Sequence, residues 1–128
     1  MVTEPMDSVH QLTADAQVAL GDLVAALAES KKLLGVRYGE WVTQAPTMEA
    51  SVAASAMAQD ELGHARVLYG LLDEARGEKM RDDTGWEVMG THLSLLERPF
   101  LNWMEFVACN ALVDPALTVV VEAATDSR

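Results

Sequence analysis

Residues 60–66 read DELGHAR, and within them Glu61 and His64 are three positions apart. On a helix, that spacing places a carboxylate and an imidazole on one face. Both groups can donate lone pairs to a metal ion, so the pair can be half of a metal site. It can equally be a polar turn on a surface helix. The helices around it decide between these two interpretations.

The stretch lies in a long helix that we expect over residues 48–76, after an N-cap at Thr47. An earlier helix is expected over residues 15–42, with Ser8 or Thr13 capping its start. The TQAP stretch that follows contains a proline and ends this helix. Because this connection is short, the two helices should form an antiparallel hairpin.

A third long helix is expected over residues 100–124, with a kink at Pro115, which lacks a backbone donor. The polar stretch 77–85 before it is interpreted as a loop. A less regular segment, in part helical, should then run as far as Pro99. These elements predict an all-α chain with a tail over residues 1–12 and one partial helical domain over 13–128.

Composition limits the function. The chain has 128 residues, half of them apolar, and a formal net charge of -11. Nucleic-acid binding is not expected, because phosphates would be repelled. No uninterrupted run of 18 apolar residues occurs, so we expect no membrane span. The single cysteine, Cys109, is typical of a reducing compartment, and we expect a cytoplasmic protein.

Ionisable residues interrupt the expected core stripes. The stripes are Leu20, Leu23, Val24, Leu27, Leu34 and Tyr38 on the first helix, Ala53, Met57, Leu68 and Leu71 on the second, and Leu101, Ala108 and Leu112 on the third. Lys31, Glu61, His64 and Glu105 fall on the same faces. Counted from the hairpin turn, Lys31, Glu61 and His64 lie at similar heights, about 21 to 28 Å along the bundle.

Two interpretations of these inward residues remain open. In one, Lys31, Glu61 and Glu105 form a buried ion-pair network, and His64 is a hydrogen-bonded core residue. In the other, Glu61, His64 and Glu105 are ligands of a metal site, vestigial or conditional. Asp60 beside them is either a group that orients His64 or a carboxylate, or a surface charge.

The second interpretation matches a ferritin-like carboxylate site, in which two helices each give a Glu and two others each give Glu-x-x-His. Here one Glu-x-x-His is present, Glu61 with His64, and one single Glu, Glu105. The second Glu-x-x-His would lie on a fourth helix that the sequence does not contain. Where the other Glu is expected, the first helix has Lys31, and Glu29 should face away from that stripe, about 200° around the helix.

Two stretches of the chain resemble a known family. The motif GEW-x-x-x-AP followed by DELGHAR, within residues 31–71, is similar to the phenylacetic acid catabolic family of phenylacetyl-CoA epoxidase proteins. Residues 102–105 (NWME) and 112–114 (LVD) resemble the third helix of the same family. The resemblance covers about residues 15–128, the first half of a typical family domain.

The resemblance implies a ferritin-like fold and one of two roles. One is a catalytic subunit with a di-iron site that epoxidises the ring of an aryl-CoA thioester, and the other is a non-catalytic partner of the same fold. In the catalytic subunit, the resemblance implies a first-helix ligand that is a Glu ten residues before the Trp of the hairpin. In this chain that Trp is Trp41, and the position ten residues before it is Lys31. The other family ligands fall on Glu61, His64 and Glu105. Because an ammonium has no lone pair for a metal, the chain is most similar to the structural subunit.

The sequence therefore predicts an all-α, ferritin-like helical bundle with three long helices present and the fourth missing. We expect a non-catalytic subunit of an aryl-CoA ring monooxygenase, with no catalytic residue and no cofactor. The alternatives are a di-iron oxygenase subunit that holds iron, and a self-assembling metal-binding half-bundle. An exposed apolar helix face should dock on a ferritin-like catalytic subunit or on a second copy of the chain.

Overall fold

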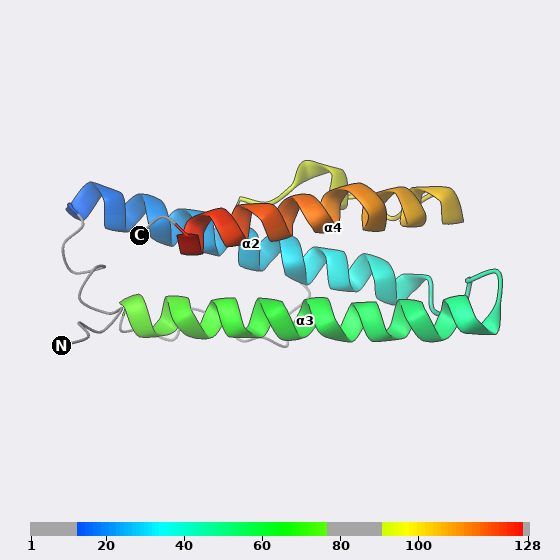
Figure 1. The fold of residues 1–128 in the computed structure, drawn as a ribbon. Coiled ribbons are helices and arrows are strands. Elements are labelled where there is room, and N and C mark those ends of the chain that lie inside the picture. The colour runs from blue at the N-terminus through cyan, green and yellow to red at the C-terminus, as the bar shows by residue number, and fades with distance from the viewer. Residues whose placement is uncertain (1–12, 77–90, 127–128) are drawn as a thin grey trace.

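The computed structural model describes residues 13–76 and 91–126, and every long element in them is a helix (Figure 1). The elements are α2 (Ala14–Glu40), α3 (Met48–Arg76), the 3₁₀ turn η1 (Ser94–Leu96) and α4 (Trp103–Asp126). No strand occurs in these residues. The all-α class is confirmed, and the three long helices are consistent with a ferritin-like bundle that lacks one helix.

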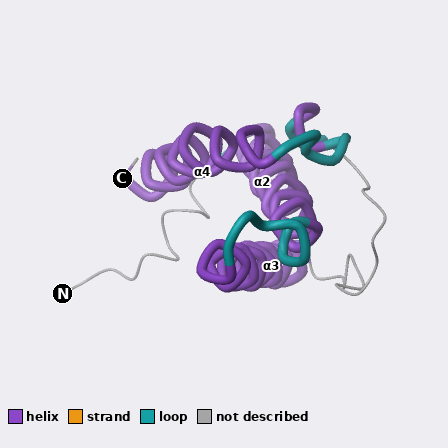
Figure 2. The backbone as a smooth tube through the Cα atoms, turned by 90° about the vertical axis from the view of Figure 1, so that its right-hand side faces the viewer, coloured by secondary structure: helices purple, strands orange, loops and turns teal. Residues whose placement is uncertain are grey.

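The helices are arranged around α2. Helices α2 and α3 form the expected antiparallel hairpin, and α4 runs in the same direction as α3 (Figure 1). Seen along the bundle, α2 occupies one corner, while α3 and α4 lie apart from one another on either side of it (Figure 2). Both outer helices pack on α2. The bundle is therefore open between α3 and α4.

Side-chain caps set the starts of the first two helices. The backbone amide of Ala16 donates to Thr13 Oγ1 at 3.3 Å, and the amide of Ala50 donates to Thr47 Oγ1 at 3.1 Å. Both threonines are N-caps as expected, because each satisfies an amide that the first helical turn leaves unpaired. Ser8, the other candidate cap, lies outside the described residues.

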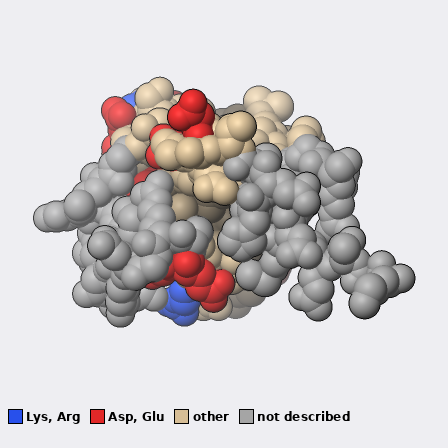
Figure 3. Space-filling view, turned by 90° about the vertical axis from the view of Figure 1, so that its left-hand side faces the viewer, with Lys and Arg blue, Asp and Glu red and all other residues tan. Residues whose placement is uncertain are grey.

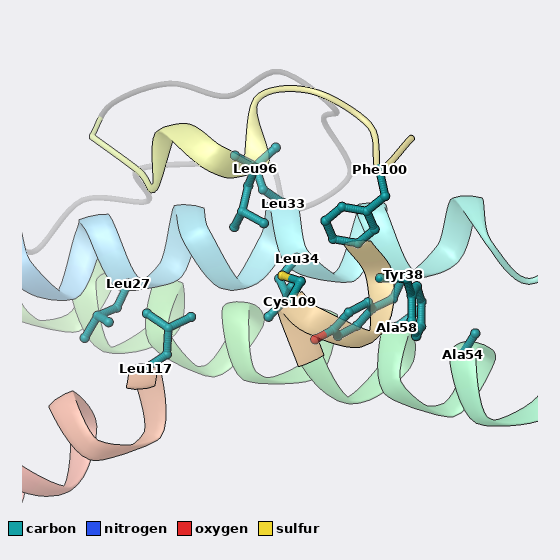
Figure 4. Close-up of a cluster of buried hydrophobic side chains, with 11 residues drawn as sticks. Leu27, Leu33, Leu34, Tyr38, Ala54, Ala58, Leu96, Phe100, Cys109 and Leu117 are labelled. Carbon is teal, nitrogen blue, oxygen red and sulfur yellow. The ribbon is translucent and has the colours of Figure 1, made fainter. Parts of the chain in front are cut away.

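The core is concentrated on the α2 side of each outer helix. Its main cluster joins Leu27, Leu33, Leu34, Tyr38, Ala54, Ala58, Leu96, Phe100, Phe106, Cys109 and Leu117 (Figure 4). A second cluster of Ala28, Ala65, Tyr69 and Leu72 joins α2 to α3. Small side chains face α2 along much of α3, which lets the two helix backbones come close. At Gly35 of α2 an added Cβ would lie 2.8 Å from Leu62 Cγ and 3.1 Å from the Ala58 carbonyl oxygen.

The expected core stripes were in part wrong. On the first helix Leu27, Leu34 and Tyr38 are buried, whereas Leu20 and Leu23 are exposed. On α3 the buried face is instead the one that carries Ala54, Ala58 and Ala65. Ala53 and Leu71 are exposed, and Met57 and Leu68 are half-buried. Leu101 lies before α4 and is exposed, and Ala108 and Leu112 on α4 are exposed because this helix packs on α2 through Phe106, Cys109 and Leu117. On α3 the physical reason is that alanines and larger apolar residues occur on adjacent faces, and close packing against α2 selects the alanines.

The segment before α4 is tied to α2 by buried polar contacts. Arg37 Nε donates to the Leu96 carbonyl oxygen at 2.8 Å, and Arg37 Nη2 donates to that of Glu97 at 2.9 Å. The amide of Leu93 donates to Ser30 Oγ at 3.1 Å. This segment is the short helical stretch expected before Pro99, whereas the loop predicted at 77–85 lies outside the described residues. The contacts fix where the chain enters α4.

Aromatic rings then anchor the first turns of α4 to the end of the hairpin. Trp103 and Phe106 stack with centroids 4.4 Å apart, and Tyr38 lies 5.0 Å from Phe106. Trp41 and Trp103 lie 6.1 Å apart. These rings bury large apolar areas where the three helices meet. From there α4 continues as a single helix through Pro115.

Helix α4 also bears on the membrane expectation. Its segment Trp103–Ala123 is 21 residues long with a mean hydropathy of 1.6, long and apolar enough to cross a membrane by length and composition, and 17% of it is buried. By this measure α4 passes the test for length and composition, and the absence of a membrane span stays a prediction. One such helix is weak evidence for a membrane span, because core helices of soluble proteins can be as long and as apolar. Asp114 near its middle would be costly in lipid.

Candidate functional site

Three helices bring one charged side chain each to the same point. Lys31 Nζ on α2 lies 2.8 Å from Glu61 Oε2 on α3 and 3.2 Å from Asp114 Oδ1 on α4. The side chains of Lys31 and Glu61 are 7% and 5% exposed, and that of Asp114 is 24% exposed. We call these three residues the charge triad. It lies in the interior of the bundle, where an isolated charge would be costly.

The two carboxyl groups of the triad compete for one ammonium. Burial raises the pKa of Glu61, and the hydrogen bond and positive charge of Lys31 oppose this rise. The negative charge of Asp114 raises the Glu61 pKa further. The triad therefore places two acidic groups beside one cation in a poorly hydrated site, with Asp114 at its more exposed edge.

Neighbouring groups are also affected by this burial. Burial raises the pKa of the Cys109 thiol to about 11, and the charges of Asp114 and Glu61 add to the rise. Burial likewise raises the pKa of Tyr38. Both groups are thus neutral near pH 7. Cys109 is buried and its thiol is protonated, as is typical of a core cysteine and not of an activated nucleophile.

His64 lies at the rim of the triad. Its Nδ1 is 3.5 Å from Glu61 Oε1, but its side chain is 60% exposed. The expectation that it is a buried core histidine was therefore wrong. The position three residues after Glu61 turns the ring to the flank of α3, because the buried face is centred on the other side of Glu61. Asp60 is exposed on the same helix.

Glu105 lies at the start of α4, away from the triad. Its carboxylate forms two bonds with Arg98, at 3.0 and 3.2 Å, and accepts from the Leu101 amide at 2.9 Å. The Glu105 amide in turn donates to Asn102 Oδ1 at 3.0 Å. The Arg98 bonds, followed by the Leu101 amide, lower the pKa of Glu105. Glu105 is thus an end-capping group paired with an exposed arginine, and the structure does not bring it to Lys31.

The acid that α4 does bring to the site is Asp114, which the sequence reasoning missed as a site residue. It lies nine residues beyond Glu105, which is about 13 Å further along a helix and half a turn around it. The position of α4 along its axis and its rotation about that axis together decide which of the two acids faces Lys31. One sequence signal was available, because Asn102 three residues before Glu105 is the pattern of a helix cap.

A second buried polar contact crosses the hairpin. Tyr69 Oη on α3 donates to Glu29 Oε1 on α2 at 2.5 Å. Glu29 is 3% exposed, and burial raises the pKa of Tyr69 to about 12. Glu29 lies about 200° around the helix from Lys31 and is itself buried, with its carboxylate against Tyr69 of α3.

The fit of these residues to a di-iron centre can be judged from their donor atoms. Such centres in ferritin-like proteins use inward carboxylates and imidazoles from each helix. In residues 13–76 and 91–126, no group of three His, Cys, Asp or Glu side chains is placed to share one ion. The two inward carboxylates instead both face the ammonium of Lys31, which has no lone pair. The donor set as it stands does not fit a di-iron cluster.

The fold and the site define a class of protein, an all-α ferritin-like bundle with one charged residue from each of three helices at its centre. Within this class, the family model described as phenylacetic acid catabolic protein matches residues 3–128. The chain belongs to that family, and the resemblance noted in its sequence is confirmed. No curated protein and no solved structure matches the chain.

Proposed function

We propose that the chain is a non-catalytic, ferritin-like subunit of a multicomponent monooxygenase that acts on the ring of an aryl-CoA thioester. Membership of the phenylacetic acid catabolic family supports the reaction class. The single observation that carries the non-catalytic role is the position of Lys31, whose Nζ lies 2.8 Å from Glu61 Oε2 and 3.2 Å from Asp114 Oδ1.

Lys31 supports this role for a physical reason. A metal ion between inward carboxylates neutralises their repulsion, and an ammonium at the same point supplies positive charge without accepting electron pairs. The subunit would then keep the packing of a carboxylate bundle without oxygen chemistry. It would serve by holding a catalytic subunit of the same fold through its exposed helix faces.

The deciding experiment is the iron content of purified protein expressed with iron available. We expect the parent chain and Lys31→Met to be free of stoichiometric iron, and Lys31→Glu to gain it. Lys31→Met is the matched control, because it also removes the ammonium but supplies no ligand. Iron in the parent, with oxygen consumed in the presence of phenylacetyl-CoA, would overturn the proposal.

That opposite outcome would favour a di-iron oxygenase subunit. The observation behind this second candidate is that Glu61 and Asp114 keep inward carboxylates and that His64 Nδ1 lies 3.5 Å from Glu61 Oε1. An oxygenase would need further ligands from another helix. A homodimer that takes up metal without consuming oxygen would instead indicate the metal-binding half-bundle.

A further inference from the structure

The charge triad brings together the three groups that an amide bond between side chains requires. Lys31 supplies an amine, and Glu61 and Asp114 supply two carboxyl groups, each from a different helix. One carboxyl group can serve as the acyl group that the amine attacks, and the other can carry the protons. The triad thus has the composition of a reaction site as well as that of an ion-pair network.

The distances hold the amine against both acids. Lys31 Nζ lies 2.8 Å from Glu61 Oε2, and it donates a hydrogen bond to Asp114 Oδ1 at 3.2 Å. Reacting groups that a fold holds about 3 to 3.5 Å apart react as if each were present at about 10⁵ M or more. Lys31 and Asp114 are 83 residues apart in the chain, so the packing of α2 against α4 produces this proximity.

Burial distinguishes the triad from an ion pair at the surface. The side chains of Lys31 and Glu61 are 7% and 5% exposed. Leu27 and Leu34, about one turn before and after Lys31 on α2, both belong to the buried core (Figure 4). In water an ammonium and a carboxylate are strongly hydrated and remain separate ions, whereas in a poorly hydrated site each charge is costly. An amide removes both charges at once, so burial favours the bond.

The charge balance of the site favours the same product. The chain has nine Lys and Arg against 20 Asp and Glu, and the end of the bundle seen in Figure 3 presents more red Asp and Glu surface than blue Lys and Arg surface among the described residues. In the triad two acids share one cation. An amide between Lys31 and Asp114 would leave Glu61 as the only acid of the triad, and one proton would neutralise it. The repulsion between the two carboxylates would then disappear.

The two acids differ in ways that assign them different roles. Asp114 accepts the Lys31 hydrogen bond, and its side chain is 24% exposed, so a water released there has a path to solvent. Glu61 is the more deeply buried acid and lies closest to the amine. Its other oxygen, Oε1, lies 3.5 Å from Nδ1 of His64, whose side chain is 60% exposed. Asp114 is therefore placed as the acyl group, and Glu61 as the group that accepts and returns a proton.

We propose that Lys31 Nζ and Asp114 Cγ join in an intramolecular isopeptide bond, with Glu61 as the proton carrier. The Lys31 ammonium gives one proton to Glu61, and the freed lone pair attacks Cγ of Asp114. As the N–C bond forms, one C–O bond of the Asp114 carboxyl group breaks. The two protons that the nitrogen loses leave with that oxygen as water, one of them by way of Glu61, which ends as it began. One amide N–H remains, and the reaction needs no oxidant and no second substrate.

This inference goes beyond the proposed function and is tested separately from it. An amide nitrogen, like an ammonium, offers no lone pair to a metal ion. The bond therefore does not change the iron content expected of the parent chain, and Lys31→Glu cannot form it because the amine is absent. A chain without the bond would leave the iron experiment and its interpretation as they stand.

The deciding experiment is the intact mass of the full 128-residue chain, unfolded in acid before electrospray mass spectrometry. We expect a mass lower than that of the sequence by one water, with or without the first methionine. An ion pair leaves the mass unchanged, because it does not survive unfolding. Lys31→Met is the matched control and should have the full mass of its sequence. A parent chain with the full mass would overturn the proposal.

A tryptic digest locates the bond. Trypsin does not cut after a modified lysine or before a proline, so the peptide that contains Lys31 should be residues 1–32, joined to residues 82–128. A bond to Glu61 would instead join residues 1–32 to residues 38–66. This second product would overturn the assignment of Asp114 as the acyl group. A loss of water confined to one unjoined peptide would also overturn the proposal, since it would show a cyclic imide and not a cross-link.

Further variants test the role of each acid. Asp114→Asn should release ammonia in place of water and reach the same final mass as the joined parent chain, whereas Asp114→Ala should keep its full mass. Glu61→Gln should form the bond about 100-fold more slowly, because the proton carrier is lost. Glu105→Gln removes an acid of α4 that pairs with Arg98, so it should join as the parent does. Circular dichroism verifies that each variant is folded, and unchanged joining in folded Glu61→Gln would overturn the proposed reaction.

Discussion

The Nζ atom of Lys31 lies 2.8 Å from Oε2 of Glu61, and the two side chains are only 7% and 5% exposed. A charge pair this deeply buried carries a large desolvation cost, which the mutual attraction offsets while both partners are present. Removal of either partner leaves the other in a poorly hydrated site. The pair therefore controls stability in a way that surface ion pairs do not.

A double-mutant cycle measures this dependence. Lys31→Met should lower the free energy of unfolding by about 3 kcal/mol, because it leaves Glu61 and Asp114 without their cation. Lys31→Met combined with Glu61→Gln should be less destabilised than the sum of the single changes. Urea unfolding followed by circular dichroism gives all three values, and simple additivity would show that the two residues do not interact.

The buried carboxyl group of Glu61 predicts a pH dependence. Burial raises its pKa in the folded chain, so the folded state binds the proton more tightly than the unfolded state, whose pKa is about 4.3. This contribution to stability is fully present below the unfolded pKa and is lost as pH rises through the folded pKa. The parent should thus lose stability relative to Glu61→Gln as pH rises from about 4.

Thermal unfolding midpoints of the two proteins across this pH range provide the measurement. The effect should be larger when both proteins carry Lys31→Met, because Lys31 lowers the pKa of Glu61. A constant difference in midpoint at every pH would contradict the assignment of a raised pKa to Glu61.

Substitution of Glu105 tests its capping role. Glu105→Gln should lower the unfolding midpoint by less than Lys31→Met does, because Glu105 caps an exposed helix start and pairs with exposed Arg98. Its lowered pKa contributes stability above the unfolded pKa that is lost as pH falls. In a Lys31→Glu background, Glu105→Gln should leave iron uptake unchanged and Asp114→Asn should abolish it. The reverse result in iron assays would make Glu105 the site acid.

Two helical glycines form a matched pair of tests. A Cβ at Gly35 would lie 3.1 Å from the Ala58 carbonyl oxygen, so Gly35→Ala should push α2 and α3 apart and cost about 1–3 kcal/mol. A Cβ at Gly63 meets nothing within 4 Å. Gly63→Ala should therefore stabilise α3 by about 1 kcal/mol through helix propensity alone. Chemical denaturation distinguishes them, and equal effects would argue against close packing at Gly35.

Local signals were sufficient to predict the helices. Thr13 and Thr47 act as the caps that the sequence indicated, and the three helices differ from their predicted ranges by no more than three residues at either end. The meeting of Lys31 with Glu61 followed from the hairpin, because a short turn fixes the relative height of two antiparallel helices.

The remaining site geometry depended on information that local spacing does not hold. The choice between Asp114 and Glu105 depends on the position of α4 along its axis and on its rotation about that axis, and the contacts of Arg37 with Leu96 and Glu97 help to set both. The buried side of α3 was ambiguous, because apolar residues lie on adjacent faces and only packing against α2 selects the alanine side. His64 was misplaced for the same reason.

The hydrogen bonds from Arg37 to the carbonyl oxygens of Leu96 and Glu97, here called the Arg37 anchor, limit how far the length of the segment after them can vary. It holds Leu96 and Glu97 against α2, and Asp114 follows seventeen residues after Glu97. One residue added to this interval would displace the carboxylate by about 1.5 Å and turn it by about 100°, away from Lys31. Insertions between the anchor and Asp114 should thus separate Asp114 from Lys31 and Glu61 even when each helix folds normally. The interval between Leu96 and Asp114 acts as a fixed spacer whose length the central charges require.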